Sequence, residues 1–467
     1  MKEKIKKMDK IKLSKILVVA YMALTFLSIL MPDEFVIGIM NLDYRLDAFQ
    51  MLMRWFNFAS FIILPVAVFF DRPTFKRISI YFCLPIAVIF IALFWQMLPY
   101  FTSERGTGIC DIRYFSDFVP KLMKNGIFRG ILFFATSLTQ IGTIVLLVMR
   151  DTSVLQFKKA DILPFAIILP CSIASVVPMY ALEGIFDTWT NVVFSFFKPA
   201  HVAWIIWVVV EIVVLTLLFR KRPMEDRYIL VLMLSLSLLL QFNQLFSSLG
   251  ELTCKRMPFQ LCNIAAYLIF ISIATKKRSM FLFNILVNVA GGVIALIVMD
   301  VENNGILNKS NIHYIVEHNN VIVVPLLCLF LRVFEPIKMK DFKLFAAFFT
   351  GYYLFVFVLG TTFNSLRAAT GSDYFFCNYL FMFDQETAAR LVGFAGKLFD
   401  IKVTWGHVTF YPVIQGLIYA AFFAIGTAMF FILKFAVRDK NKPSPDVKAK
   451  ETKPVSAEKA LLGNVTN

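Results

Sequence analysis

Apolar residues along the chain fall in blocks of about 20, separated by shorter polar segments. At ~1.5 Å per residue, a helix of that length crosses the ~30 Å hydrocarbon core of a bilayer. Each block must be helical, because backbone without internal hydrogen bonds cannot face lipid. The pattern predicts an all-α fold, a polytopic bundle of about twelve transmembrane helices. The predicted spans lie at roughly 16–31, 48–70, 78–101, 128–149, 161–182, 201–219, 228–246, 257–275, 279–299, 320–334, 343–363 and 409–434.

Charged residues divide the loops between these blocks into two classes. Seven lysines fall in the first fifteen residues, and every second loop is short and basic: 71–77, 150–160, 220–227, 276–278 and 335–342. The alternate loops that carry acidic or mixed charge are 32–47, 183–200 and 300–319. Basic loops stay on the cytoplasmic side of a membrane. We therefore predict that both termini are cytoplasmic.

Composition narrows the function classes. Of the 467 residues 59% are hydrophobic and 17% are charged, and the mean hydropathy of +0.72 excludes a water-soluble domain. A net charge of +16 could indicate nucleic acid as a partner, but the excess lies in the tails and alternate loops, without a base-reading motif. We expect membrane lipids as partners, no nucleic acid, and a location in the cell membrane, a bacterial plasma membrane.

Motifs for nucleotides and metals are missing from the sequence. It contains neither a phosphate-binding glycine loop nor paired Cys-x-x-Cys or His-Glu-x-x-His ligands, so we predict no cofactor and no metal site. The seven cysteines are an odd number, which argues against a complete disulfide framework. Cys110, Cys254 and Cys377 fall in predicted outer loops, where one pair could be oxidised.

Cys262 stands out among the cysteines because it lies in the first turns of the eighth predicted span. A helix N-terminus favours the thiolate, which is the nucleophilic form, but the effect fades after one turn and a base is needed. His318 opens the tenth predicted span at a similar depth, and Asp300 ends the ninth. Together they could form a nucleophile, a base and an orienting carboxylate. A chance match in depth among the four histidines is the alternative.

Glu211 is the one carboxylate near the centre of a predicted span. An ionisable group at that depth costs a few kcal/mol, so it usually faces the bundle interior and has a partner. Asn288 of the ninth predicted span lies at a similar depth, and Gln241 and Gln244 of the seventh lie closer to the outer surface. Glu211 is then either a polar clamp between helices or a site for a headgroup, a cation or a proton.

The second half of the chain resembles a known family. Residues 257–263 (MPFQLCN) resemble the Leu-Pro-Leu-His/Gln-Leu-Cys-Asp/Asn signature of the YwaF-like bacterial membrane proteins and their animal relative, the transmembrane protein 164 family. The glycine-rich helix at 291–296 before Asp300, His318 before 321–326, and Asn364 followed by 371–374 are similar in order. The resemblance covers about residues 200–435.

The resemblance implies a cysteine-dependent phospholipid acyltransferase, with Cys262 as acyl acceptor and His318 as its partner. It departs from the usual pattern at Met257, Gln260 and Asp373, the last of which could change contacts with a headgroup. The expected substrate-binding residues are Gln260, Asn263, Asn364, Asp373, Tyr374 and Glu211.

Three regions are expected from this comparison. They are a membrane region of about five spans without a recognised counterpart (1–200), the YwaF-like domain of about seven spans (201–435) and a disordered basic tail (436–467). Three functions stay open: a lipid acyltransferase, a transporter or lipid flippase built around Glu211, and a non-catalytic envelope scaffold. The outward clustering of polar residues favours the first.

Overall fold

The computed structural model describes residues 2–30, 46–94, 126–177, 192–248, 254–297, 305–385 and 395–437, with the isolated Leu182. Asp300, Cys110, most of the loop predicted at 32–47, and nearly all of the predicted tail lie outside the described residues. What is described is helical apart from short turns and one small β-hairpin.

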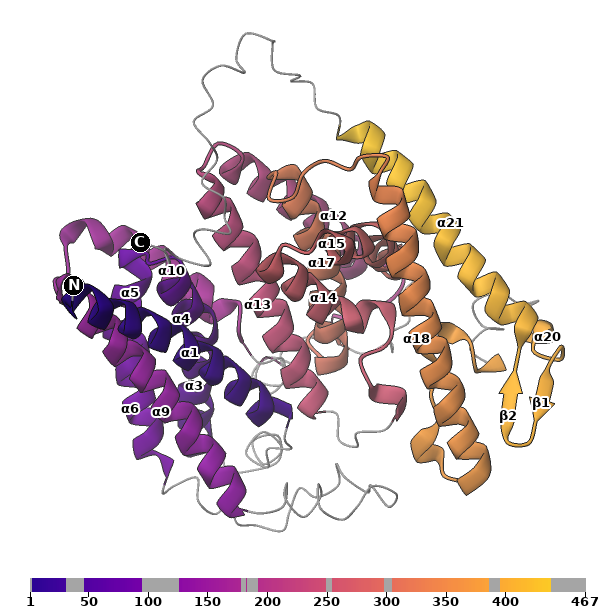
Figure 1. Cartoon of the computed structure of the whole chain (residues 1–467), viewed down its shortest axis with the longest axis horizontal. Helices are drawn as coiled ribbons and strands as arrows, with labels where there is room; N and C mark the ends of the chain where they lie inside the picture. Colours follow the sequence, from indigo (N-terminus) through magenta and orange to yellow (C-terminus); the bar gives the residue numbers. More distant parts are fainter. Residues whose placement is uncertain are drawn as a thin grey trace, which may run out of the picture.

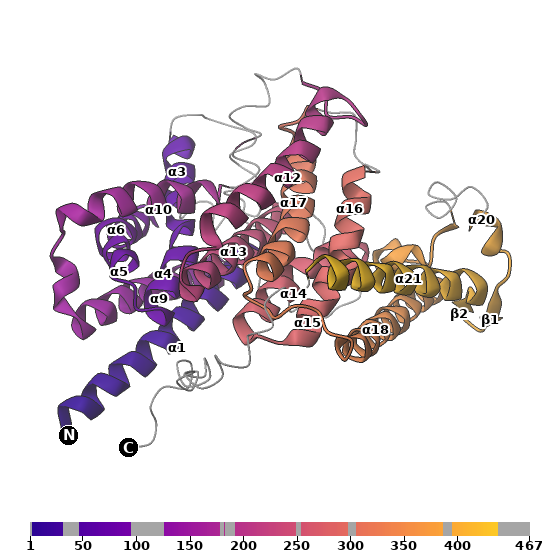
Figure 2. The same ribbon diagram turned by 90° about the horizontal axis from the view of Figure 1, so that it is seen from above.

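The first group of helices lies to one side of the molecule (Figures 1 and 2). It comprises α1 (Lys2–Leu30), α3 (Leu46–Phe58), α4 (Ser60–Phe69), α5 (Pro73–Ile78), α6 (Leu84–Ala92), α9 (Gly126–Arg150) and α10 (Ile162–Ala174). A π-helical turn, Ser79–Cys83, joins α5 to α6, and 3-10 turns lie at Thr152–Leu155 and Lys159–Asp161. Helix α1 packs along α9.

The second group forms the rest of the bundle. Its helices are α12 (Pro199–Phe219), α13 (Met224–Ser248), α14 (Leu261–Thr275), α15 (Arg278–Phe283), α16 (Val289–Ile297), α17 (Lys309–Phe330), α18 (Asp341–Thr370), α20 (Ala395–Leu398) and α21 (Pro412–Ala436). A π-turn, Asn284–Asn288, joins α15 to α16, and 3-10 turns lie at Cys254–Arg256, Asp373–Phe375 and Tyr379–Phe381. Strands β1 (Val403–Trp405) and β2 (Val408–Phe410) form an antiparallel hairpin beside α18.

The two groups of helices share one hydrophobic core. Buried residues from α1 and α4 pack in the same cluster as residues from α13, α17 and α21. At the end of the bundle that carries the basic loops, Arg72 pairs with Glu225 at 2.6 Å and with Asp226 at 2.9 Å. The first group is therefore packed against the rest of the protein.

The multi-pass membrane class is confirmed, because nine described helical stretches are long and apolar enough to cross a bilayer. The other three predicted spans fall on α10, α13 and α14, which are helices of 13, 25 and 15 residues. The count of twelve and the orientation of the termini stay predictions.

Two predicted boundaries were wrong. Helix α17 begins at Lys309 rather than near 320, because Asn308 caps it by accepting a hydrogen bond from the Ser310 amide at 3.0 Å. Helix α18 runs on to Thr370 rather than 363, and it ends where Gly371 takes a left-handed conformation (φ +70°). The hairpin that follows was not predicted, although Gly406 marks its turn.

Helix α21 offers a matched test of this packing. A β-carbon at Gly426 would lie 2.5 Å from the ring of Phe345 on α18, whereas one at Gly416 would meet nothing within 4 Å. We expect Gly426→Val to lower the free energy of unfolding by about 1–3 kcal/mol through overpacking, and Gly416→Val to leave it nearly unchanged. Thermal unfolding of the two purified variants measures this difference. Equal stability of the two variants would contradict the packing of α21 on α18.

Candidate functional site

Cys262 lies in the first turn of α14. Gln260 precedes the helix without capping it through its side chain, so the amides of Leu261, Cys262 and Asn263 have no helical acceptor. The thiol is half-buried and donates to Asn263 Oδ1 at 3.2 Å. The cysteine therefore lies beside a set of backbone N–H groups that point out of the helix end.

Helix α17 packs against α14 and brings three ionisable residues into the bundle. His313 Nε2 lies 3.2 Å from Glu317 Oε2, one turn further along. The side chain of Glu317 is only 4% exposed, and its carboxylate lies within electrostatic range of Cys262, His313 and His318. The structure thus brings a thiol, a carboxylate and two imidazoles into one buried cluster, which we call the Cys262 cluster.

The hydrogen bond of His318 fixes which ring nitrogen carries the proton. Its Nδ1 lies 2.7 Å from the carbonyl oxygen of Tyr314, an atom that can only accept, so Nδ1 is the donor. In the neutral ring Nε2 then carries a lone pair and can accept a proton. The ring also packs against that of Tyr314, with centroids 4.2 Å apart. His318 is therefore held in the tautomer that a general base requires.

Polar atoms of the Cys262 cluster leave two hydrogen-bonding positions open. Among the described residues, Glu317 Oε1 and His313 Nδ1 are buried without a partner. Tyr267, near Glu317, donates to Asn243 Oδ1 at 2.7 Å, and Tyr352, near Cys262, donates to the Phe259 carbonyl at 2.7 Å. The open acceptor and the open imidazole nitrogen are positions where a bound molecule could make hydrogen bonds.

A buried segment at 376–383 packs against the start of α14. Gln260 donates to the Asn378 carbonyl at 2.8 Å and accepts from the Leu380 amide at 3.0 Å. Leu380 and Phe381 both have left-handed backbone (φ 54° and 61°), which costs about 1–3 kcal/mol at each non-glycine position. Such strain persists only where surrounding contacts hold it, and the two bonds to Gln260 are contacts of this kind.

Two residues expected to bind substrate hold this segment in place. Both ends of the Gln260 amide are occupied by it, and Asn364 donates to the Cys377 carbonyl at 2.9 Å. Tyr379 belongs to the same segment, and its hydroxyl donates to the carbonyl of Cys254. The hydrogen bonds of Gln260 and Asn364 are therefore structural.

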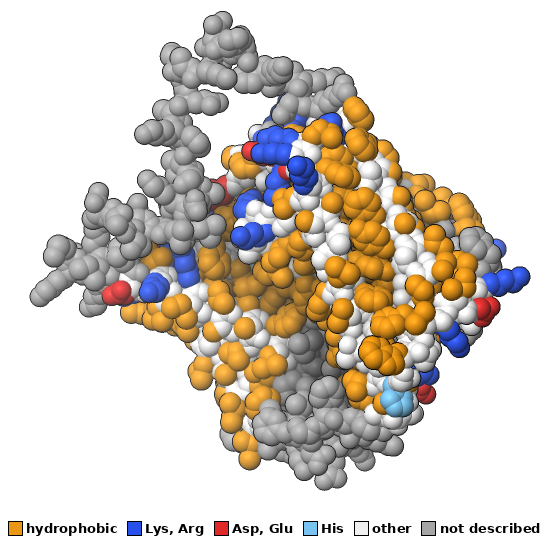
Figure 3. Space-filling view, turned by 45° about the vertical axis from the view of Figure 1, so that its right-hand side comes forward, with side chains coloured by type: hydrophobic (Ala, Val, Ile, Leu, Met, Phe, Trp, Pro, Cys, Tyr) orange, Lys and Arg blue, Asp and Glu red, His pale blue; other side chains and the backbone are white. Residues whose placement is uncertain are grey.

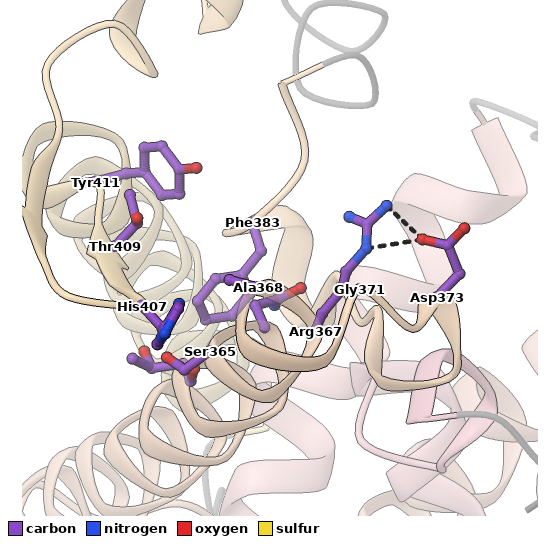
Figure 4. A pocket seen from close by; sticks show the side chains of 11 residues that line it. Ser365, Arg367, Ala368, Gly371, Asp373, Phe383, His407, Thr409 and Tyr411 are labelled. Atoms are coloured by element: carbon purple, nitrogen blue, oxygen red, sulfur yellow. Dashed lines mark hydrogen bonds and ion pairs between the residues drawn. The ribbon is translucent and has the colours of Figure 1, made fainter. Parts of the chain in front are cut away.

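A separate open cleft of about 470 Å³ lies where α18 ends beside the hairpin (Figure 4). Asn364 and Asp373 line it, with Arg367 pairing with Asp373 at 2.6 Å. Cys262 and His318 do not line it. The predicted residues are thus divided between two places, the Cys262 cluster and this cleft.

Glu211 makes its hydrogen bond to a residue of α17 that the comparison of depths did not single out. Its carboxylate accepts from Asn319 Nδ2 at 2.9 Å, whereas Asn288 donates to Asn284 and Gln241 to the Ser175 carbonyl. Asn319 follows His318 on α17, so Glu211 clamps α12 to the helix that carries the histidines.

The other two histidines differ from those of α17. His201 is fully buried: it accepts from the Phe197 amide at 3.0 Å and donates to the Leu296 carbonyl at 2.7 Å. Both nitrogens of His201 are thus satisfied, which is a structural arrangement. His407 is exposed on the hairpin turn.

Cys254 and Cys377, the latter within the segment 376–383, are both buried and form no disulfide. Burial raises the pKa of the Cys254 thiol to about 11. Burial, together with the nearby Cys254, raises the pKa of Cys377 to about 12. Both therefore remain thiols at neutral pH.

Sequence reasoning missed Glu317 and His313 as members of the cluster. Both were assigned to an outer loop, because the start of α17 was placed too late. Their four-residue spacing puts them on one face of a helix, and Asn308 followed by Lys309-Ser310 is a recognisable helix start. These two features of the sequence predict that Glu317 and His313 lie inside the helix.

The region of the chain that holds these residues matches a known protein family. Residues 196–427 match the sequence model of the TMEM164 family. This part of the chain belongs to the TMEM164 family. The match runs from just before α12 into α21 and confirms the region expected from the cysteine signature. No curated protein and no solved structure matches the chain. In this TMEM164 region lie the Cys262 cluster, the cleft and the segment 376–383.

Gln260→Met should loosen the segment 376–383, because methionine fills a similar volume but makes neither hydrogen bond. We expect alkylation of Cys262 by a membrane-permeant maleimide to become several-fold faster. Peptide mass spectrometry of the alkylated protein over time measures the rate, and the same variant carrying Cys262→Ser supplies the background. An unchanged rate in a folded Gln260→Met protein would show that the segment does not limit access to the thiol.

Proposed function

We propose that the TMEM164 region is a membrane-embedded lipid acyltransferase that carries the acyl group on Cys262 as a thioester. The observation that carries the proposal is the Cys262 cluster: a half-buried thiol and an imidazole with its Nε2 available to accept a proton, both within electrostatic range of one buried carboxylate, Glu317. A thiol, a base and a charge to stabilise that base are the parts that covalent acyl transfer requires.

The first half-reaction forms the thioester. His318 Nε2 takes the proton from Cys262 Sγ, and the thiolate attacks the carbonyl carbon of a lipid ester. The tetrahedral intermediate collapses with cleavage of the carbon–oxygen bond, and the departing alkoxide takes the proton from His318. The products are an acylated Cys262 and a lipid with a free hydroxyl group.

The second half-reaction runs through the same residues. A lipid alcohol loses its proton to His318 and attacks the thioester carbonyl, the carbon–sulfur bond breaks, and the thiolate regains a proton. Water in place of the alcohol would make the same site a lipase. Glu317 Oε1, which has no donor among the described residues, offers an acceptor for the attacking hydroxyl group.

Glu317 takes the role that the sequence suggested for Asp300. When His318 is protonated, a carboxylate within electrostatic range stabilises the imidazolium. The His313–Glu317 contact holds that carboxylate toward the cluster. Asp300 lies outside the described residues, so its part stays a prediction.

Backbone amides are the better oxyanion donors here. The side-chain amide of Gln260 already donates to the carbonyl of Asn378. The amides of Leu261, Cys262 and Asn263 open α14 and also carry the positive end of the helix dipole. A carbonyl oxygen on the Cys262 thioester would lie beside these donors.

Substitution of the two central residues tests the reaction. We expect Cys262→Ser to abolish transfer of an isotope-labelled acyl chain between lipids in proteoliposomes. We expect His318→Gln to lower the rate by about 10²–10⁴-fold, which is the usual contribution of a general base. Cys328→Ser and His407→Gln are matched controls outside the cluster and should keep wild-type rates.

Two results would contradict the proposal. Full transfer by a folded Cys262→Ser protein would exclude the covalent route, and full transfer by His318→Gln would exclude that histidine as the base. Loss of transfer in the control variants would mean that the assay follows membrane integration rather than chemistry.

A further inference from the structure

The hairpin between α20 and α21 has two faces of opposite chemistry. Ile401, Val403 and Trp405 alternate along β1 with Lys402 and Thr404, and Val408 and Phe410 alternate along β2 with Thr409. In the register of the hairpin, Val403 lies opposite Phe410 and Trp405 opposite Val408. Since side chains of opposite residues share a face, one side of the hairpin is apolar and the other is polar.

The polar face of the hairpin lines a cleft, and the β2 half of its apolar face packs against α18. Thr409 and His407 line the cleft described above (Figure 4). On the apolar side, Phe410 stacks against Phe357 of α18 with ring centroids 6.0 Å apart. Strand β2 is therefore anchored to α18, and β1 lies on its outer side.

The β1 half of the apolar face is uncovered. Val403 is 57% exposed and Trp405 is 83% exposed, and Ile401, just before the strand, is 52% exposed. A two-stranded hairpin is only marginally stable in water, and an exposed apolar strand invites aggregation. In an aqueous loop this arrangement would be unfavourable, so something apolar is expected to cover it.

The position of the hairpin along α18 indicates what covers it. Helix α18 has 30 residues, about 45 Å, which equals the thickness of a bilayer including its headgroup layers. The hairpin packs beside the second half of this helix, and α21 enters its own apolar run at Pro412, directly after β2. Near Phe357, α18 exposes further apolar side chains, Leu354, Phe355 and Val358. Figure 3 shows hydrophobic side chains over most of this side of the molecule.

We propose that the β1–β2 hairpin is a membrane-interface anchor, with Ile401, Val403 and Trp405 lying in the lipid of the leaflet next to α18. Tryptophan is enriched at this level of membrane proteins, and a lysine beside it reaches back to the headgroups, as Lys402 on the opposite face can. The polar face then lines a cleft that opens at the lipid boundary. This inference does not depend on the chemistry of Cys262.

Quenching of tryptophan fluorescence tests this assignment in the full-length protein. The protein is reconstituted in vesicles, and the contribution of Trp405 is the difference between wild type and Trp405→Phe. We expect lipids with brominated acyl chains to quench this contribution strongly and aqueous iodide to quench it several-fold less. The matched control is Thr404→Trp in the Trp405→Phe background, which reports from the polar face and should show the reverse preference.

Two outcomes would overturn the proposal. Stronger quenching of Trp405 by iodide than by brominated lipid would place the face in water. Weak quenching by both would mean that a second copy or another protein covers it. Because Trp405→Phe and Thr404→Trp alter an exposed hairpin only, loss of acyl transfer in Cys262→Ser leaves this test unaffected.

Discussion

The candidate site depends on the contact between Glu317 and His313, two polar side chains that α17 carries into an apolar bundle. A lone carboxylate at 4% exposure would be expensive to keep ionised, and the contact between His313 and Glu317 offsets that cost. The same carboxylate lies within electrostatic range of both Cys262 and His318. Stability and the proposed chemistry thus depend on one group.

The surrounding architecture serves to hold this group. Asn319 ties α17 to α12 through Glu211, and Tyr267 lies against Glu317 from α14. At the open end, Gln260 fixes the segment 376–383 over the start of α14 despite two left-handed residues in a row. Polar side chains that the sequence suggested as substrate contacts are thereby used to position the cluster. The cleft beside the hairpin is a second polar surface, placed at the lipid boundary by a strand pair whose other face is apolar.

Much of the fold could be predicted because a bilayer imposes a simple rule on length and hydropathy. Every predicted span has a helix, and the match of residues 196–427 to the TMEM164 family agrees with the resemblance first seen around Cys262. The site was harder to predict, since it depends on where helices begin. Moving the start of α17 to Lys309 shifts Glu317 from a loop into the core. Partners such as Asn319 for Glu211 could not be predicted, because helix rotation in a bundle is set by packing, which the hydropathy pattern does not specify.

The most direct measurement is the mass of the peptide that contains Cys262, taken from the full-length protein during turnover with lipid vesicles. The account predicts an added acyl mass on Cys262 that neutral hydroxylamine removes, as a thioester requires, and that is absent in His318→Gln. Finding no acyl adduct on Cys262 in protein that is actively transferring acyl chains would contradict the account.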